Sequence, residues 1–152
     1  MECRRVNSSD PAHVDDVPVK ATWERLEADA KAVLIDVRTR SEWAFVGIPD
    51  LSALSRRPVL VEWLTFPENR ANPEFVAQLS QMLASVGADH DTELYFICRS
   101  GGRSLQAAKA MTSAGFRKCH NVAEGFEGPL DPKRQRGTQT GWKAEGLPWS
   151  QG

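Results

Sequence analysis

Cys98 lies between a segment with the pattern of a strand and a segment with the pattern of a helix. Cys98 follows the apolar run 94–97, and a loop with two glycines and two arginines leads into a helical pattern. In such an arrangement, loop N–H groups and the positive end of the helix dipole converge on one point and stabilise an anion there. The nucleophilic form of cysteine is the thiolate. This stretch therefore predicts an activated cysteine in an anion-binding loop.

Other phosphate, redox and metal motifs are absent from the sequence. The loop has no lysine for a nucleotide P-loop, and the chain has neither G-x-G-x-x-G nor C-x-x-C. The histidines His13, His90 and His120 are scattered without the spacing of metal ligands. We therefore expect no metal site and no cofactor.

The spacing of Cys98 and Arg103 separates two kinds of chemistry. Phosphatases of related architecture place five residues between cysteine and arginine, whereas four residues lie between them here. A shorter loop makes a tighter ring of N–H groups, which suits a sulfur atom better than a phosphoryl group. No aspartate is placed as the general acid that ester cleavage needs. Phosphatase or arsenate reductase activity is the least favoured alternative.

Length and composition predict one soluble, cytoplasmic domain. The chain has 152 residues, 19 basic against 20 acidic, so its charge favours neither nucleic acid nor membrane partners. It has no apolar run of membrane-spanning length, and its first residues do not resemble a secretory signal. The three cysteines, Cys3, Cys98 and Cys119, are widely spaced, which fits a reducing compartment.

Apolar runs alternate with helical patterns along the chain. Residues 1–17 are polar and aperiodic and are expected to form a flexible tail, followed by one domain over 18–152. Continuous apolar runs indicate parallel strands covered on both faces. We expect a doubly wound α/β fold with a mainly parallel sheet and helices on both faces. The expected strands are 32–37, 58–63, 93–98 and 118–122, and the expected helices are 22–26, 41–45, 104–114 and one capped by Asn72 with Pro73 at its first position.

Four segments, in this order, resemble those of single-domain rhodaneses. The first is Leu-Ile-Asp-Val-Arg-Thr at 34–39, with Glu-Trp at 42–43 and Gly-Ile-Pro at 47–49; the others are the cysteine loop 98–104, Asn-Val-Ala-Glu-Gly at 121–125 and the stretch 141–148. The likeness covers about residues 19–149. One departure is that Gly47 meets Ile48 directly, where many relatives have an intervening histidine.

The resemblance implies a thiosulfate sulfurtransferase. In rhodaneses the loop cysteine attacks a sulfane sulfur, for example of thiosulfate, and releases sulfite. The persulfide on Cys98 would then pass its sulfur to a thiophilic acceptor such as cyanide, a thiol or a thiol on a protein. The expected partners are thus a small anionic sulfur donor and a thiol acceptor. A sulfur-relay or regulatory binding module with little thiosulfate turnover is the alternative.

The resemblance also assigns roles within the loop. It implies that Arg99 and Arg103 bind the anionic donor, and that the loop glycines allow close approach of substrate to the backbone. Ser104 would cap the helix. The expected substrate-binding residues are Arg99, Ser100, Gly101, Gly102, Arg103 and Ser104.

Residues outside the loop have open roles. Asp36 either accepts hydrogen bonds from the loop or anchors the turn that follows it. Arg38 and Glu42, four residues apart, are expected to form an ion pair, and Cys119 is expected to be structural. The inserted segment 128–140 carries Lys133, Arg134 and Arg136. It is either a solvated loop or a means of steering anionic donors or a protein partner.

Overall fold

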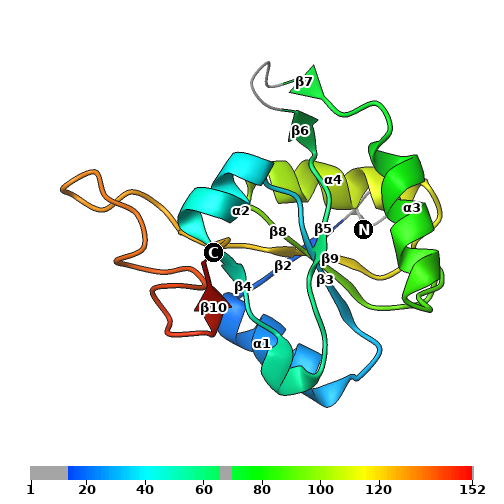
Figure 1. Ribbon diagram of the computed structural model, residues 1–152, viewed down its shortest axis with the longest axis horizontal. Coiled ribbons are helices and arrows are strands. Elements are labelled where there is room, and N and C mark those ends of the chain that lie inside the picture. Colours follow the sequence, from blue (N-terminus) through cyan, green and yellow to red (C-terminus); the bar gives the residue numbers. More distant parts are fainter. Residues whose placement is uncertain (1–13, 66–69, 152) are drawn as a thin grey trace, which may run out of the picture.

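Five parallel strands form the centre of the protein (Figure 1). A computed structural model describes residues 14–65 and 70–151. The strands lie in the order β2–β9–β8–β3–β5, and each neighbouring pair is parallel. The mainly parallel α/β sheet expected from the sequence is confirmed. The strands are β2 (Asp15–Val17), β3 (Val33–Asp36), β5 (Val59–Leu60), β8 (Leu94–Ile97) and β9 (Cys119–Val122).

Helices cover both faces of this sheet. Helix α1 (Val19–Ala28) packs against one face, whereas α3 (Phe75–Ser85) and α4 (Gly102–Ser113) pack against the other (Figure 1). Neighbouring residues of β8 point to opposite faces: Tyr95 belongs to the cluster with α1, and Phe96 to the cluster with α3 and α4. Both faces are buried, which explains why the strands read as unbroken apolar runs.

Short antiparallel pairs complete the fold. After α2 (Arg40–Val46), strand β4 (Ile48–Pro49) pairs with β10 (Trp149–Ser150), so the end of the chain returns to the end of α2. Strand β6 (Leu64–Thr65) pairs with β7 (Arg70–Ala71), and a 3-10 turn, η1, covers Ser52–Leu54. Within residues 14–65 and 70–151, no helix is both long and apolar enough to cross a membrane.

Several element boundaries differ from the sequence-based expectation. Residues 15–17, assigned to the flexible tail, form the edge strand β2, while residues 1–13 lie outside the described part of the chain. The helix expected at 22–26 is the longer α1. Helix α3 begins at Phe75 because Asn72 accepts a hydrogen bond from the N–H of Glu74 (3.0 Å) and caps a preceding turn.

The parallel arrangement brings the segments that follow β3, β8 and β9 to one edge of the sheet. The segments after β3, β8 and β9 all leave from the same edge of the sheet, since parallel strands share their carboxyl edge. In Figure 1 this edge faces α2, β10 and the protruding segment drawn in orange. The cysteine loop follows β8, the central strand of the five.

Candidate active site

The sulfur of Cys98 lies at the start of helix α4. Cys98 follows β8 directly, and only 1% of its surface is exposed. Its Sγ accepts a hydrogen bond from the backbone N–H of Gly101 (3.1 Å) and lies 3.2 Å from the hydroxyl of Ser104. The N–H groups in the first turn of α4 have no acceptor within the helix. Two hydrogen-bond donors, the Gly101 N–H and the Ser104 hydroxyl, therefore lie against the sulfur.

Ser104 has a different role from the expected one. It is the third residue of α4 rather than its cap, and the helix is preceded by Gly101, which makes no side-chain cap bond. The Ser104 hydroxyl is completely buried, 2.5 Å from Oδ1 of Asn121 and 3.2 Å from the cysteine sulfur. A hydroxyl has a single proton, so it donates to only one of these two acceptors at a time.

Asn121 is a site residue that the sequence reasoning missed. Its Nδ2 group donates to the carbonyl of Gly101 (3.2 Å) and to Oδ1 of Asp16 in β2 (3.0 Å). Its side chain thus connects the cysteine loop, α4 and the edge strand. A buried asparagine within a short strand is the signal that would have identified it, because a buried polar side chain requires partners.

The segment 125–128 holds the loop from behind. The carbonyl of Cys98 accepts the N–H of Phe126 (2.8 Å), and the carbonyl of Arg99 accepts the N–H groups of Glu127 (3.0 Å) and Gly128 (3.1 Å). Gly125 has a φ of +72°, and a Cβ there would lie 2.6 Å from both carbonyl oxygens. Only glycine fits this contact, so the loop and the segment behind it pack as one unit.

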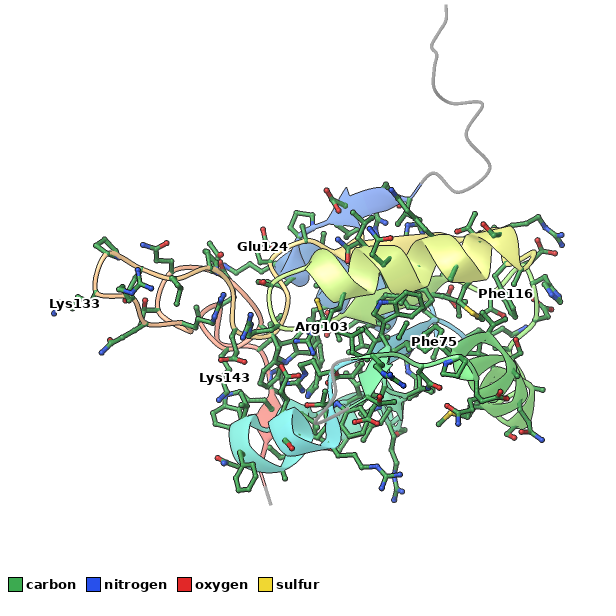
Figure 2. The ribbon with its side chains drawn as sticks, turned by 90° about the horizontal axis from the view of Figure 1, so that it is seen from above. Phe75, Arg103, Phe116, Glu124, Lys133 and Lys143 are labelled. Carbon is green, nitrogen blue, oxygen red and sulfur yellow. The ribbon has the colours of Figure 1, made fainter. Side chains whose placement is uncertain are left out.

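Arg103 forms a two-armed ion pair with Glu42 of α2, with N–O distances of 2.6 and 2.9 Å. Burial alone would raise the pKa of the Glu42 carboxyl. The hydrogen bonds and charge of Arg103, the N–H of Thr39 and the charge of Arg38 outweigh burial and lower that pKa to about 2. The pair joins α2 to the start of α4, and Figure 2 shows Arg103 at that end of the helix.

The expected pair between Arg38 and Glu42 is wrong. Arg38 instead binds Asp36, with Nη2 2.5 Å from Oδ2 and Nε 2.9 Å from Oδ1, and its Nη2 also donates to the carbonyl of Gly47 (2.7 Å). Both side chains of this pair are fully buried. Of the two roles left open for Asp36, anchoring the following turn is the one observed, and within residues 14–65 and 70–151 its carboxylate accepts hydrogen bonds only from Arg38.

The remaining loop residues face solvent. Arg99, Ser100 and Gly102 are exposed, so a donor can reach them directly. The two glycines differ in function. Gly101 has a φ of +107°, and a Cβ there would overlap the carbonyl oxygen of Ala123, whereas a Cβ on Gly102 would meet no atom within 4 Å.

Comparisons with known proteins identify the family. A family model described as the STR4 middle domain matches residues 15–152. The putative sulfurtransferase YtwF of Bacillus subtilis is 32% identical over 123 residues, covering 79% of this chain and 97% of that protein. This chain belongs to the rhodanese-like sulfurtransferase family. The resemblance predicted from the sequence is confirmed, and membership supports a role in sulfur transfer.

Two further proteins match most of the chain. The uncharacterized protein RC0915 of Rickettsia conorii is 35% identical over 127 residues, covering 84% of this chain and 89% of the relative. The crystal structure of Rv0390 from M. tuberculosis is 44% identical with a TM-score of 0.82, covering 92% of this chain and 99% of that one. The fold and the family are therefore shown over nearly the whole described chain.

Two further side chains near the sheet have packing roles. Burial raises the pKa of the Cys119 thiol to about 11, so this thiol is protonated at neutral pH, in keeping with a structural role. Trp63 packs edge-on against Phe75 with ring centres 5.0 Å apart. No group of three His, Cys, Asp or Glu side chains within residues 14–65 and 70–151 is placed to hold a metal ion.

We expect Gly101→Ala to disrupt the loop and Gly102→Ala to leave it intact. The first change forces a side chain into a left-handed backbone conformation and against a carbonyl, which costs about 1–3 kcal/mol. The alkylation rate of Cys98 by iodoacetamide should fall at least about tenfold, because the Gly101 N–H moves away from the sulfur. Urea unfolding and alkylation measured on both variants check this. Equal effects of the two substitutions would contradict it.

We expect Glu42→Gln to destabilise the protein in a pH-dependent way. Because the pKa of Glu42 is lowered from 4.5 to about 2 on folding, its ion pair stabilises the fold above pH 4.5, and the stabilisation is lost as pH falls toward 2. The difference in unfolding free energy from the unaltered protein should be about 1–2 kcal/mol at pH 7 and vanish near pH 2. Asp91→Asn, which breaks an exposed pair with Arg117, is the control and should have a much smaller effect. A difference for Glu42→Gln that does not change with pH would refute the assignment.

Proposed function

We propose that this protein transfers a sulfane sulfur from thiosulfate, or a similar small anionic donor, to a thiophilic acceptor through a persulfide on Cys98. The observation that carries the proposal is the position of the Cys98 sulfur. It lies at the start of α4, in contact with the Gly101 N–H and the Ser104 hydroxyl. The Gly101 N–H stabilises the negative charge that both the thiolate and the persulfide carry, and the Ser104 hydroxyl does so when its single proton turns from Asn121 to the sulfur.

In the first proposed step the Cys98 thiolate attacks the outer sulfur of thiosulfate. A bond forms between the two sulfurs, the S–S bond of thiosulfate breaks, and sulfite leaves with the electron pair. In the second step an acceptor thiolate or cyanide attacks the outer sulfur of the persulfide, and Cys98 leaves as a thiolate. Each step breaks one sulfur–sulfur bond by nucleophilic attack and forms one new bond to the transferred sulfur, from sulfur or, with cyanide, from carbon; the covalent intermediate predicts ping-pong kinetics. The proposed reaction draws on no cofactor, and its location in the cytoplasm stays a prediction.

Within this proposal the two arginines act differently. Arg99 is exposed, and no ion pair of its guanidinium occurs within residues 14–65 and 70–151, so we assign it to the anionic donor. Arg103 uses both terminal nitrogens on Glu42, so we assign it to holding α2 against the loop. The proposed substrate-binding loop remains 99–104; within it the Gly101 N–H and the Ser104 hydroxyl lie against the sulfur, and Arg103 acts by holding α2.

Mass spectrometry tests the persulfide. After incubation with thiosulfate, the protein should gain the mass of one sulfur atom, and Cys98→Ser should gain none. The Cys119→Ser variant is a matched control and should still be loaded, because the protonated Cys119 thiol is unreactive at neutral pH. Loading only from a persulfidated thiol would favour the relay function over a thiosulfate enzyme. No loading from either, together with hydrolysis of a phosphate ester, would overturn the proposal.

The roles of Arg99 and Arg103 are distinguished by comparing thiosulfate with a neutral organic trisulfide as sulfur donors. Arg99→Ala should raise the KM for thiosulfate about three- to tenfold and leave the neutral donor unchanged, because only the anion loses a charge partner. Arg103→Ala should reduce use of both donors, because Glu42 loses its partner and α2 its connection to the loop. The assignment fails if Arg99→Ala affects both donors equally.

A further inference from the structure

The segment 128–140, here called the arm, projects from the edge of the sheet that carries the cysteine loop. Figure 2 shows it extending away from the start of α4, with Lys133 at its far end and Arg103 near its base. The arm joins the cysteine loop through backbone contacts, because Gly128 donates its N–H to the carbonyl of Arg99 (3.1 Å). A partner bound to the arm would therefore lie beside the cysteine loop.

The arm is an ordered structure held by its own hydrogen bonds. Oδ1 of Asp131 accepts the N–H groups of Lys133 (2.9 Å) and Gln135 (2.8 Å), and its Oδ2 accepts the hydroxyl of Thr138 (2.6 Å). These bonds lower the pKa of Asp131, chiefly through Thr138, so its carboxylate stays ionised and engaged within the arm. At the base, the guanidinium of Arg136 donates to the carbonyl of Gly128 (2.7 Å).

Two basic side chains at the tip of the arm form no ion pair with the residues that the structure describes. Lys133 and Arg134 are exposed, and neither forms an ion pair within residues 14–65 and 70–151. Arg134 has a φ of +63°, a conformation that costs free energy for any residue but glycine. An arginine held in a strained turn at the tip of an ordered projection points to a use for that charge, since strain of this kind concentrates at binding sites.

Large apolar side chains accompany the charges. Leu130 of the arm is 45% exposed, Phe45 of α2 is 79% exposed and Trp149 of β10 is 40% exposed. Lys143, which follows the arm, lies 3.9 Å from the ring of Trp149 and makes a cation–π contact. The arm, α2 and β10 all lie on one side of the molecule in Figure 1. Exposed aromatic and basic side chains together are typical of protein interfaces.

We propose that the arm is a docking element for an acidic protein that delivers sulfur to Cys98 or receives it. The proposal rests on the sulfur transfer proposed above and names the class of its macromolecular partner. Charge complementarity with Lys133 and Arg134 selects an acidic surface, and the exposed apolar side chains select a protein over a free anion. Two unpaired basic side chains neutralise too few phosphates to hold a nucleic acid.

Transfer from the persulfide to peptide thiols tests the docking. The acceptor is a synthetic peptide with one cysteine, four glutamates and one phenylalanine, compared with the same peptide carrying glutamine for each glutamate. The unaltered protein should react about tenfold faster with the acidic peptide at low salt, and this advantage should shrink as salt screens the charges. Equal rates with the two peptides would overturn the proposal.

Charge reversal shows whether the faster reaction with the acidic peptide depends on the arm. The double variant Lys133→Glu and Arg134→Glu should lose about tenfold in rate with the acidic peptide and less than about twofold with the glutamine peptide. The matched control reverses Lys31 and Arg57 to glutamate, two exposed residues outside the arm, and should change neither rate by more than about twofold. A control loss as large as that of the arm variant would show a general charge effect and refute docking at the arm.

A binding measurement separates docking from sulfur chemistry. Fluorescence anisotropy of the acidic peptide, with serine in place of its cysteine, is measured against the Cys98→Ser protein, which cannot form a persulfide. Binding that is lost in the arm variant supports docking even if thiosulfate loading fails, so the two proposals fail independently. Single-stranded RNA that binds more tightly than the acidic peptide, and loses binding in the arm variant, would overturn the assignment of a protein partner.

Discussion

The side-chain amide of Asn121 is hydrogen-bonded to three separate parts of the chain around Cys98. It accepts from the Ser104 hydroxyl at the start of α4, and it donates to the Gly101 carbonyl in the loop and to Asp16 in β2. The side chains of Ser104 and Asn121 are both buried. Loss of either one would leave the other with an unsatisfied polar group, at a cost of about 1–3 kcal/mol. The loop can adopt its tight shape around sulfur only while this network is complete. The geometry of the cysteine loop thus depends on an amide that forms no hydrogen bond with Cys98.

A second buried polar pair fixes the neighbouring wall of the site. Asp36 and Arg38 are fully buried together, and Arg38 extends to the carbonyl of Gly47 and lies over the ring of Phe126 at 4.3 Å. The guanidinium thereby connects the end of β3, the turn after α2 and the segment behind the cysteine loop. Burial of both charges is tolerable because the carboxylate and two of the three guanidinium nitrogens are hydrogen-bonded, while the buried Nη1 has no acceptor among the described residues. Removing either one would leave a bare charge in the core.

The cysteine loop was predictable because its signal is local. An apolar run, a cysteine, two glycines and a helical pattern lie within a dozen residues, and each element follows from chain geometry alone. The contact between Asn121 and Asp16 was not predictable, since these residues are 105 positions apart. Strand β2 was missed for a related reason: it is a sheet edge, Asp15 and Asp16 are exposed, and only Val17 is buried, so its sequence reads as a polar tail.

The error over Arg38 has a local cause. The four-residue spacing rule applies when both residues lie on one helix, but α2 begins only at Arg40 with Thr39 as its cap. Arg38 therefore precedes the helix and turns inward to Asp36. Glu42 does lie on α2, where its side chain also closes a capping box with Thr39 and is left free to meet Arg103. Arg38 and Glu42 therefore each have another partner, Asp36 and Arg103, rather than each other.

The arm leaves and rejoins the domain at nearly the same point. A Cβ on Gly128 would overlap the carbonyl of Thr140, and a Cβ on Gly141 would lie 2.8 Å from the nitrogen of Gly128, so the two ends of the arm touch backbone to backbone. Because its two ends adjoin, the arm can vary without displacing the rest of the domain. Length and sequence can change in the arm during evolution while the strands and the cysteine loop keep their packing. Changes in the arm and changes in the cysteine loop can therefore arise separately within one small fold.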